Sequence, residues 1–216
     1  MLQIRLNLRE IFAIVICFAG TIMFLSCDKE DKEPRKDHLT YDEGVVINGI
    51  KWATRNVSAV GKFAAKPEDA GMFYQWNRKV AWAAIGDVSD WDTTIPEGIT
   101  WEKTNDPSPT GWRVPTTWEI FQLCNREKVT NEWAIVNNVK GRKFTDIATG
   151  NSIFLPAASC RGYVEGTLYP FGWDGRYWSS TQSNDKSAFY LHFDSEVAYS
   201  ASSHCRYGLT VRCVSE

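Results

Sequence analysis

The sequence predicts an α+β fold, with one main helix among many short strands and long loops. Three observations support this prediction. From Gly44 onward, short β-like runs alternate with turn residues. One helix is signalled at about residues 116–127, and residues 84–111, rich in Gly, Asp, Thr and Pro, predict a long ordered loop. The residues alone would also allow a mostly β domain.

A hairpin is expected at the start of the domain. Val45-Val46-Ile47 precedes Asn48-Gly49, and Ile50-Lys51-Trp52 follows it. Asn-Gly readily takes the positive φ angles of a tight turn. Later strands are expected over the runs 132–136, 141–145, 152–155, 177–181, 188–193 and 208–214, with Gly150-Asn151 marking one turn.

The helix has a clear beginning. Thr116 stands at the N-cap position and Glu119 follows three residues later, which is the pattern of a capping box. The apolar residues Ile120, Phe121, Leu123 and Cys124 then continue a stripe to about Glu127.

The N-terminus has the pattern of an export signal. Arg5 and Arg9 precede an apolar run over residues 11–25, and Ser26 stands before Cys27. The fifteen residues of this run fall short of the roughly 20 that span a bilayer. An ordinary signal peptide or an uncleaved anchor is the alternative.

The residues around Cys27 resemble the lipobox of bacterial lipoproteins, with Phe24 in place of the usual leucine. The resemblance implies that Cys27 becomes the mature N-terminus and carries acyl chains that hold the protein on a membrane. The expected organisation is therefore a signal peptide (1–27), a charged flexible tether (28–43) and one folded domain (44–216).

Charge excludes one class of partner. Removal of the signal, with Arg5, Arg9 and Glu10, changes the net charge from −2 to −3. A nearly neutral chain without a basic stripe does not predict binding to nucleic acid.

Seven short segments stand in order along the folded part of the chain: 52–57 (WATRNV), 74–76 (YQW), 105–109 (NDPSP), 111–116 (GWRVPT), 155–158 (LPAA), 177–181 (YWSST) and 208–214 (GLTVRCV). Together they resemble the Fibrobacter succinogenes major paralogous domain, found in exported lipoproteins of gut Bacteroidetes. The resemblance covers about residues 44–214. The family is similar to C-type lectin-like domains and to the formylglycine-generating enzyme fold, which implies a helix packed on a twisted, mostly antiparallel sheet.

The same resemblance implies a location. Lipoproteins of this group often carry an acidic stretch after the lipidated cysteine that directs them to the cell surface, and residues 28–33 look like such a stretch. We therefore expect an outer-membrane lipoprotein of the cell envelope, exposed at the surface. A merely solvated spacer would look similar.

Four cysteines remain in the folded part of an exported chain, which favours disulfides over reactive thiols. In C-type lectin-like domains a helix cysteine joins the last strand. The resemblance thus implies Cys124–Cys213, with Cys160–Cys205 as the second pair. A Cys205–Cys213 link is the alternative.

No metal, cofactor or catalytic residue is expected. His38, His192 and His204 lack the paired spacing of a zinc site, and no calcium loop, phosphate-binding loop or hydrolase motif is present. Glu165 and Asp174 are the least implausible acid pair, although a solvated turn explains them better.

All ten tryptophans lie between Trp52 and Trp178. Trp52, Trp112, Trp118 and Trp178 are expected in the core because they adjoin the predicted strands and helix. Four others lie in loops, where exposed rings can stack on sugars or anchor a protein interface. The candidate ligand-binding residues are Trp82, Trp91, Trp101, Trp173 and Asp174.

The expected function is recognition of a glycan or a surface protein, without enzymatic activity. The loops between Val80 and Asp106 and around Glu165 to Arg176 would bind the ligand. An enzyme or enzyme accessory of the formylglycine-generating fold and a structural envelope component without a ligand are the alternatives.

Overall fold

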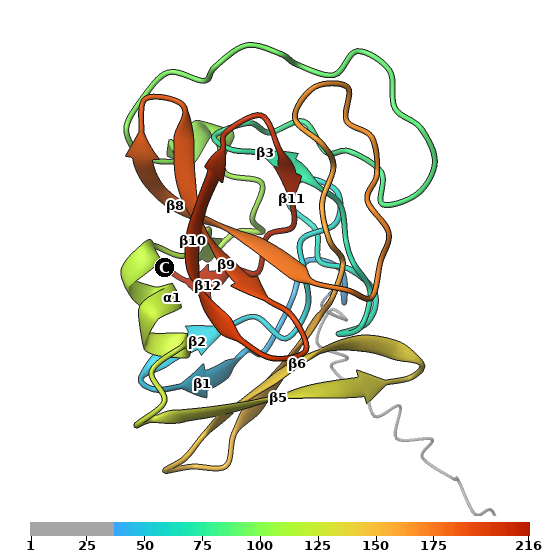
Figure 1. The fold of residues 1–216 in the computed structure, drawn as a ribbon. Coiled ribbons are helices and arrows are strands. Elements are labelled where there is room, and N and C mark those ends of the chain that lie inside the picture. The colour runs from blue at the N-terminus through green and yellow to red at the C-terminus, as the bar shows by residue number, and fades with distance from the viewer. Residues whose placement is uncertain (1–36) are drawn as a thin grey trace, which may run out of the picture. The chain divides into compact units, whose positions relative to one another are not determined.

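The computed structural model describes residues 37–216, which are mostly β (Figure 1). The predicted α+β, C-type lectin-like fold is wrong: twelve short strands form four small antiparallel sheets, and only one α-helix accompanies them in this part of the chain. The chain reverses or leaves a sheet every few residues, so no single large sheet forms for the helix to cover.

The first sheet has the strand order β1-β2-β12-β4. The predicted hairpin is confirmed, since Ile47 pairs with Ile50 and the φ angles of Asn48 and Gly49 are 47° and 77°. The members are β1 (Val45–Ile47), β2 (Ile50–Trp52), β4 (Trp112–Arg113) and β12 (Val214–Ser215).

Two further three-stranded sheets contain most of the longer strands, and one two-stranded sheet completes the set. The first is β5 (Val129–Val136), β6 (Val139–Asp146) and β7 (Ser152–Pro156). The second is β10 (Ala198–His204), β9 (Ser187–Phe193) and β8 (Gly175–Asn184), and the pair is β3 (Tyr74–Gln75) with β11 (Gly208–Leu209).

The β8–β10 sheet lies between two hydrophobic clusters. Because successive side chains of a strand point to opposite faces, Trp178 and Tyr190 enter one cluster, while Tyr177 and Leu191 enter the other. The first cluster also holds Trp76, whose indole N–H donates to Ser179 O (2.9 Å).

Helix α1 (Thr117–Leu123) begins with the predicted capping box but ends four residues before the predicted limit. Ile120 and Leu123 are buried, whereas Trp118 and Phe121 are 60% and 53% exposed. The expectation of a core position for Trp118 is therefore wrong, because residues 118 and 121 lie on the face of the helix opposite the buried stripe. A short 3-10 helix (Lys103–Asn105) interrupts the long loop that precedes β4. No helix of residues 37–216 is long and apolar enough to cross a membrane.

The expected disulfides are absent among the described residues: Cys124, Cys160, Cys205 and Cys213 are all free thiols. Cys124 caps the end of α1 beside one hydrophobic cluster, while Cys213 lies in the other and its thiol donates to Ser108 Oγ (3.1 Å). Cys160 and Cys205 are both buried in the cluster that holds Cys213. Burial raises the pKa of Cys160 to about 11 and those of Cys124 and Cys205 to about 12. Such thiols are protonated at neutral pH and therefore weak nucleophiles.

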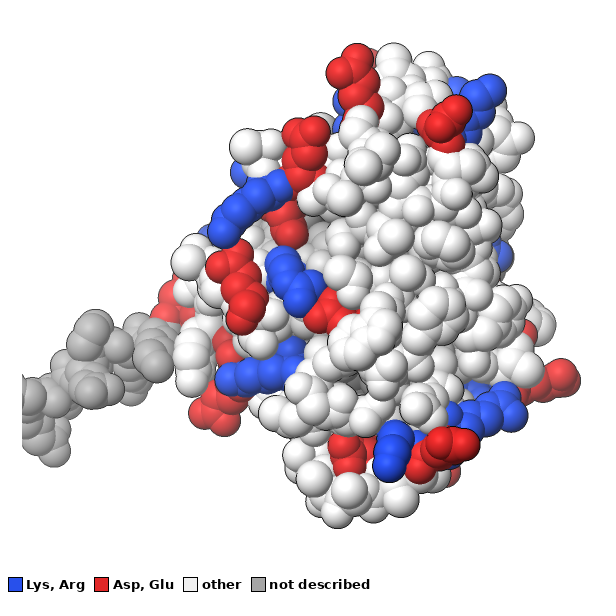
Figure 2. Space-filling model, turned by 90° about the vertical axis from the view of Figure 1, so that its left-hand side faces the viewer, with Lys and Arg blue, Asp and Glu red and all other residues white. Residues whose placement is uncertain are grey.

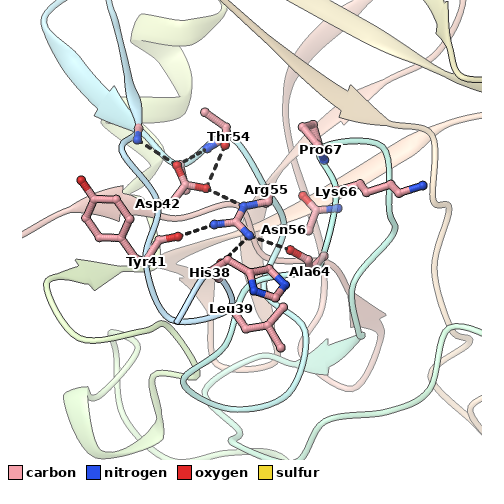
Figure 3. Close-up of polar contacts among 12 residues, drawn as sticks. His38, Leu39, Tyr41, Asp42, Thr54, Arg55, Asn56, Ala64, Lys66 and Pro67 are labelled. Atoms are coloured by element: carbon pink, nitrogen blue, oxygen red, sulfur yellow. Dashed lines mark hydrogen bonds and ion pairs between the residues drawn. The ribbon is translucent and has the colours of Figure 1, made fainter. Parts of the chain in front are cut away.

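Residues 37–43, the described end of the expected tether, pack against the domain (Figure 3). The Arg55 guanidinium donates to the carbonyl oxygens of His38 (2.6 Å) and Tyr41, and to the carboxylate of Asp42 (3.1 Å). Phe63 N donates to Leu39 O (2.6 Å). The segment predicted as a signal peptide, with Cys27, and the rest of the predicted tether lie outside the described residues.

The Asp42 carboxylate fixes this segment. Burial alone would raise its pKa, but hydrogen bonds from the main-chain N–H groups of Thr54 and Gly44, from the Thr54 hydroxyl and from Arg55 together lower it. The ionised form is thus the form that the folded state prefers.

We predict that Asp42→Asn lowers the free energy of unfolding at pH 7 by about 2 kcal/mol, since it weakens charge-assisted hydrogen bonds. A carboxylate whose pKa is lower in the folded than in the unfolded state stabilises the fold at pH values above its unfolded pKa of about 4. This stability is lost as the pH falls through the pKa of the folded state. Urea unfolding from pH 7 to pH 2 should therefore show the gap between wild type and variant closing in acid. The exposed Asp185→Asn change is the control, and a gap that stays constant to pH 2 would contradict the role of the charge.

Candidate functional site

The two loops predicted to bind a ligand lie together, and buried Arg161 joins them. Its guanidinium donates to Ala83 O (2.8 Å) and Gly86 O (2.8 Å) in the first loop and to Gly166 O (2.6 Å) in the second. Burial lowers the pKa of Arg161, but guanidinium starts from so high a value that it stays charged. One side chain thus holds segments that are about 80 residues apart in the sequence.

Trp82 and Trp91 fill the joint between these loops. Both are half-buried, and their ring centroids lie 4.9 Å apart. Trp91 also packs on Gly166 and Gly208: a Cβ atom at Gly166 would clash with its ring, and one at Gly208 would lie 2.8 Å from it. These two indoles therefore serve to pack the loops rather than to form an open platform.

The other candidate residues are dispersed. Trp101 is only 7% exposed, packs against Trp76 and donates its indole N–H to Asn105 O (2.9 Å). Trp173 is 76% exposed. Asp174 is largely buried and pairs with Arg176 (Nε to Oδ2, 2.7 Å). Of the five residues predicted to bind a ligand, Trp173 alone presents an open side chain.

Exposed aromatic side chains are instead concentrated on residues 163–173, here called the aromatic loop. One charged residue, Glu165, lies on it. Its exposed large apolar residues are Tyr163 (38%), Val164 (57%), Tyr169 (48%), Phe171 (42%) and Trp173 (76%).

The aromatic loop is held at both ends. Gly162 N donates to Thr167 O (2.8 Å), and Gly172 N donates to Ala157 O (2.8 Å). Phe171 stacks on the buried Phe73, with ring centroids 6.3 Å apart. The rings are thus presented on a supported backbone.

A cluster from the end of β10 extends this surface. The ring of Tyr163 lies 5.5 Å from that of His204 and 5.1 Å from that of Tyr207, and the Arg206 guanidinium lies 5.5 Å above it. His204 Nδ1 accepts from Arg206 N (3.3 Å). Burial, with the charges of Arg206 and Lys186, lowers the pKa of His204, which favours the neutral ring.

Sequence reasoning missed this cluster. From the sequence, His204 was considered as a zinc ligand and rejected because it lacks a partner at the right spacing. The available signal was the pair of tyrosines in a glycine-rich segment, 162–175, which has the composition of binding loops more than of a packed strand.

The His, Cys, Asp and Glu side chains of residues 37–216 do not gather into a metal site. No group of three or more His, Cys, Asp or Glu side chains there could hold a metal ion. Glu165 is exposed on the aromatic loop, while Asp174 is occupied by Arg176.

A second exposed aromatic pair, Trp118 and Phe121, lies on α1. Figure 2 looks onto the side of the molecule where α1 lies, and charged side chains lie along its left, at the top and across the bottom, around a broad uncharged area. The charged residue of α1, Glu119, is buried against Arg113 (2.6 Å). This pair provides a matched control for substitutions on the aromatic loop.

We predict that Gly166→Ala loosens the joint, because the new Cβ would meet the Trp91 ring. Gly86→Ala is the matched control: both glycines have φ near +67° (68° and 67°), yet nothing lies within 4 Å of a Cβ at Gly86. Urea unfolding should show Gly166→Ala to be about 1–3 kcal/mol less stable than Gly86→Ala. Limited proteolysis should cut it faster in the aromatic loop. Equal losses for the two variants would contradict the packing role of Trp91.

A family model described as a domain of unknown function (DUF8237) is similar to residues 129–214 of the chain. The matched part begins with β5 and includes the aromatic loop, whereas the loop that Arg161 joins to it lies outside. Comparison with curated proteins and with solved structures found no match.

Proposed function

We propose that the chain is a lipid-anchored, non-enzymatic recognition module of the cell envelope that binds a protein partner through the aromatic loop. The observation that carries this proposal is the concentration of exposed rings on residues 163–173. Scattered single apolar residues are normal on a protein surface, but a contiguous set suggests an interaction site.

The composition of the loop favours a protein partner. Tyrosine, tryptophan and arginine dominate the binding energy of protein interfaces, and tyrosine with glycine is typical of antibody binding loops. Val164 and Phe171 add apolar area without polar groups. A saccharide would gain less from the purely apolar side chains of Val164 and Phe171 than a protein would.

Support beneath the loop strengthens the proposal. Arg161, the Trp82–Trp91 pair and the stack of Phe171 on Phe73 fix the backbone that presents the rings. A surface held in its binding conformation loses less conformational entropy when a partner binds.

The anchor rests on the sequence around Cys27. A lipid at this residue, on the outer membrane and facing outward, would present the domain to partners outside the cell. The charged residues after Cys27 suit a spacer between the lipid and the domain.

We predict that the paired substitution Tyr169→Ala and Trp173→Ala weakens partner binding at least about 30-fold, the effect of losing one interface hot spot. The partner is to be isolated from envelope and host surface proteins with the wild-type domain, and the dissociation constants of both forms then measured with the purified partner. Trp118→Ala, which removes a similarly exposed indole on α1, should change binding less than about twofold.

Two other outcomes would change this proposal. If no protein partner is found, and wild type binds a glycan array that the paired variant does not bind, the ligand of the aromatic loop is a glycan. Equal binding by the paired variant and wild type would overturn the role of the aromatic loop.

We predict that Cys27→Ser releases the full-length chain from the membrane fraction, because the acylated residue is lost. Cys17→Ser, inside the apolar run, is the matched control and should leave the chain in that fraction. Metabolic labelling with palmitate should mark wild type and Cys17→Ser but not Cys27→Ser. Retention and labelling of Cys27→Ser would contradict lipidation at this residue.

A further inference from the structure

A cleft of about 620 Å³ lies beside β4, away from the aromatic loop, with which it shares no lining residue. Its volume falls in the range of small-molecule sites, roughly 300–1,000 Å³. It opens between the segment around the 3-10 helix, the residues leading into β4, Ser180 of β8 and Glu216.

Two indoles line the cleft and are fixed from behind. Trp101 packs against Trp76, and its indole N–H is held by Asn105 O. Trp112 packs against Phe63 in a T-shaped arrangement, with ring centroids 5.7 Å apart, and Lys51 Nζ lies 6.0 Å from the centroid of its ring. The half-buried Trp112 therefore provides a rigid apolar wall for a ligand.

The charges that line the cleft balance. Lys103 and Arg113 are cationic, and Asp106 and Glu216 are anionic. Arg113 is already engaged by Glu119 in two hydrogen bonds (2.8 and 2.6 Å), and the Asp106 carboxylate accepts from Ser108 N and Val114 N.

Lys103 and Glu216 remain adaptable. Their side chains are 85% and 47% exposed, and Lys103 Nζ lies 3.0 Å from Glu216 Oε1. An exposed ion pair of this kind contributes little to stability, so its members can exchange their contact for hydrogen bonds to a ligand. Together they offer an ammonium donor and a carboxylate acceptor at one place.

We propose that this cleft binds a neutral saccharide of one or two rings. The C–H face of a sugar ring would lie against Trp112, and vicinal hydroxyls would donate to Glu216 and accept from Lys103. Because the lining carries equal numbers of positive and negative side chains, it gives no advantage to a strongly anionic or cationic ligand. An apolar ligand would leave the Lys103 ammonium and the Glu216 carboxylate without hydrogen bonds, whereas the hydroxyls of a sugar would satisfy both.

The test is titration of the full chain with glucose, galactose, N-acetylglucosamine and maltose, followed by tryptophan fluorescence and by saturation-transfer NMR. Binding of at least one of them with a dissociation constant of about 1 mM or tighter is expected. Lys103→Met and Glu216→Gln should each weaken it at least about fivefold, through loss of one hydrogen bond of about 1 kcal/mol. Lys128→Met, an exposed lysine outside the cleft, should leave it unchanged.

The paired variant Tyr169→Ala and Trp173→Ala separates this site from the proposed recognition function, because it should bind the saccharide as wild type does. Absence of binding by all four sugars, or equal binding by Lys103→Met and Glu216→Gln, would overturn the proposal. Tighter binding of galacturonate or glucosamine than of the neutral sugars would overturn the assignment of ligand class.

Discussion

Guanidinium groups hold the loops of this domain together by donating to main-chain carbonyl oxygens. The main-chain carbonyl oxygens of residues outside regular strands have no hydrogen-bond partner on a neighbouring strand. Where these oxygens are buried, they need another donor. Arg212 donates to Ala53 O (3.2 Å), Phe154 O (3.2 Å) and Asn56 Oδ1 (2.8 Å), while Arg142 donates to Asp194 O (2.7 Å). Arg161 and Arg55 do the same elsewhere. A planar fork with five donors can serve several carbonyls at once, which an ammonium group cannot do as well.

This arrangement explains how short strands can support the two proposed binding surfaces. Because the sheets are small, the position of the loops depends on contacts that cross between them. Arg161 sets the aromatic loop against its neighbour, and the Arg113–Glu119 pair ties β4, beside the cleft, to the start of α1. Both proposed surfaces therefore lie beside side-chain contacts that fix the irregular chain.

Local signals in the sequence predicted local structure well. The turn at Asn48-Gly49 and the capping box at Thr116 depend on neighbouring residues, and both formed. Strand β10 was missed because its sequence, AYSASSH, has small polar residues and no β-branched side chain. The single strand expected over residues 208–214 became β11 and β12, with Arg212 turned into the core between them.

Long-range contacts could not be read from the sequence. Arg161 meets carbonyls of the first loop 75 to 78 residues away, and Arg212 meets carbonyls 58 and 159 residues away. Nothing in the sequence around either arginine identifies these distant partners. The lectin-like pairing of cysteines failed for the same reason, since it required a topology that the chain does not adopt. The tryptophans predicted to lie in loops, Trp82, Trp91, Trp101 and Trp173, do lie outside the helices and strands, but Trp101 is buried in the core. Only the fold decides which rings pack and which remain open.

The docking of residues 37–43 through Arg55 would limit how far the domain can stand from the proposed anchor. If Cys27 carries the lipid, only residues 28–36, nine in number, separate it from the docked segment. A fully extended chain spans at most about 3.5 Å per residue, so this connection could reach about 30 Å. That distance is close to the diameter of a small domain. The proposed anchor would therefore keep the domain within about its own width of the membrane, which would favour a partner that is itself attached to a neighbouring surface.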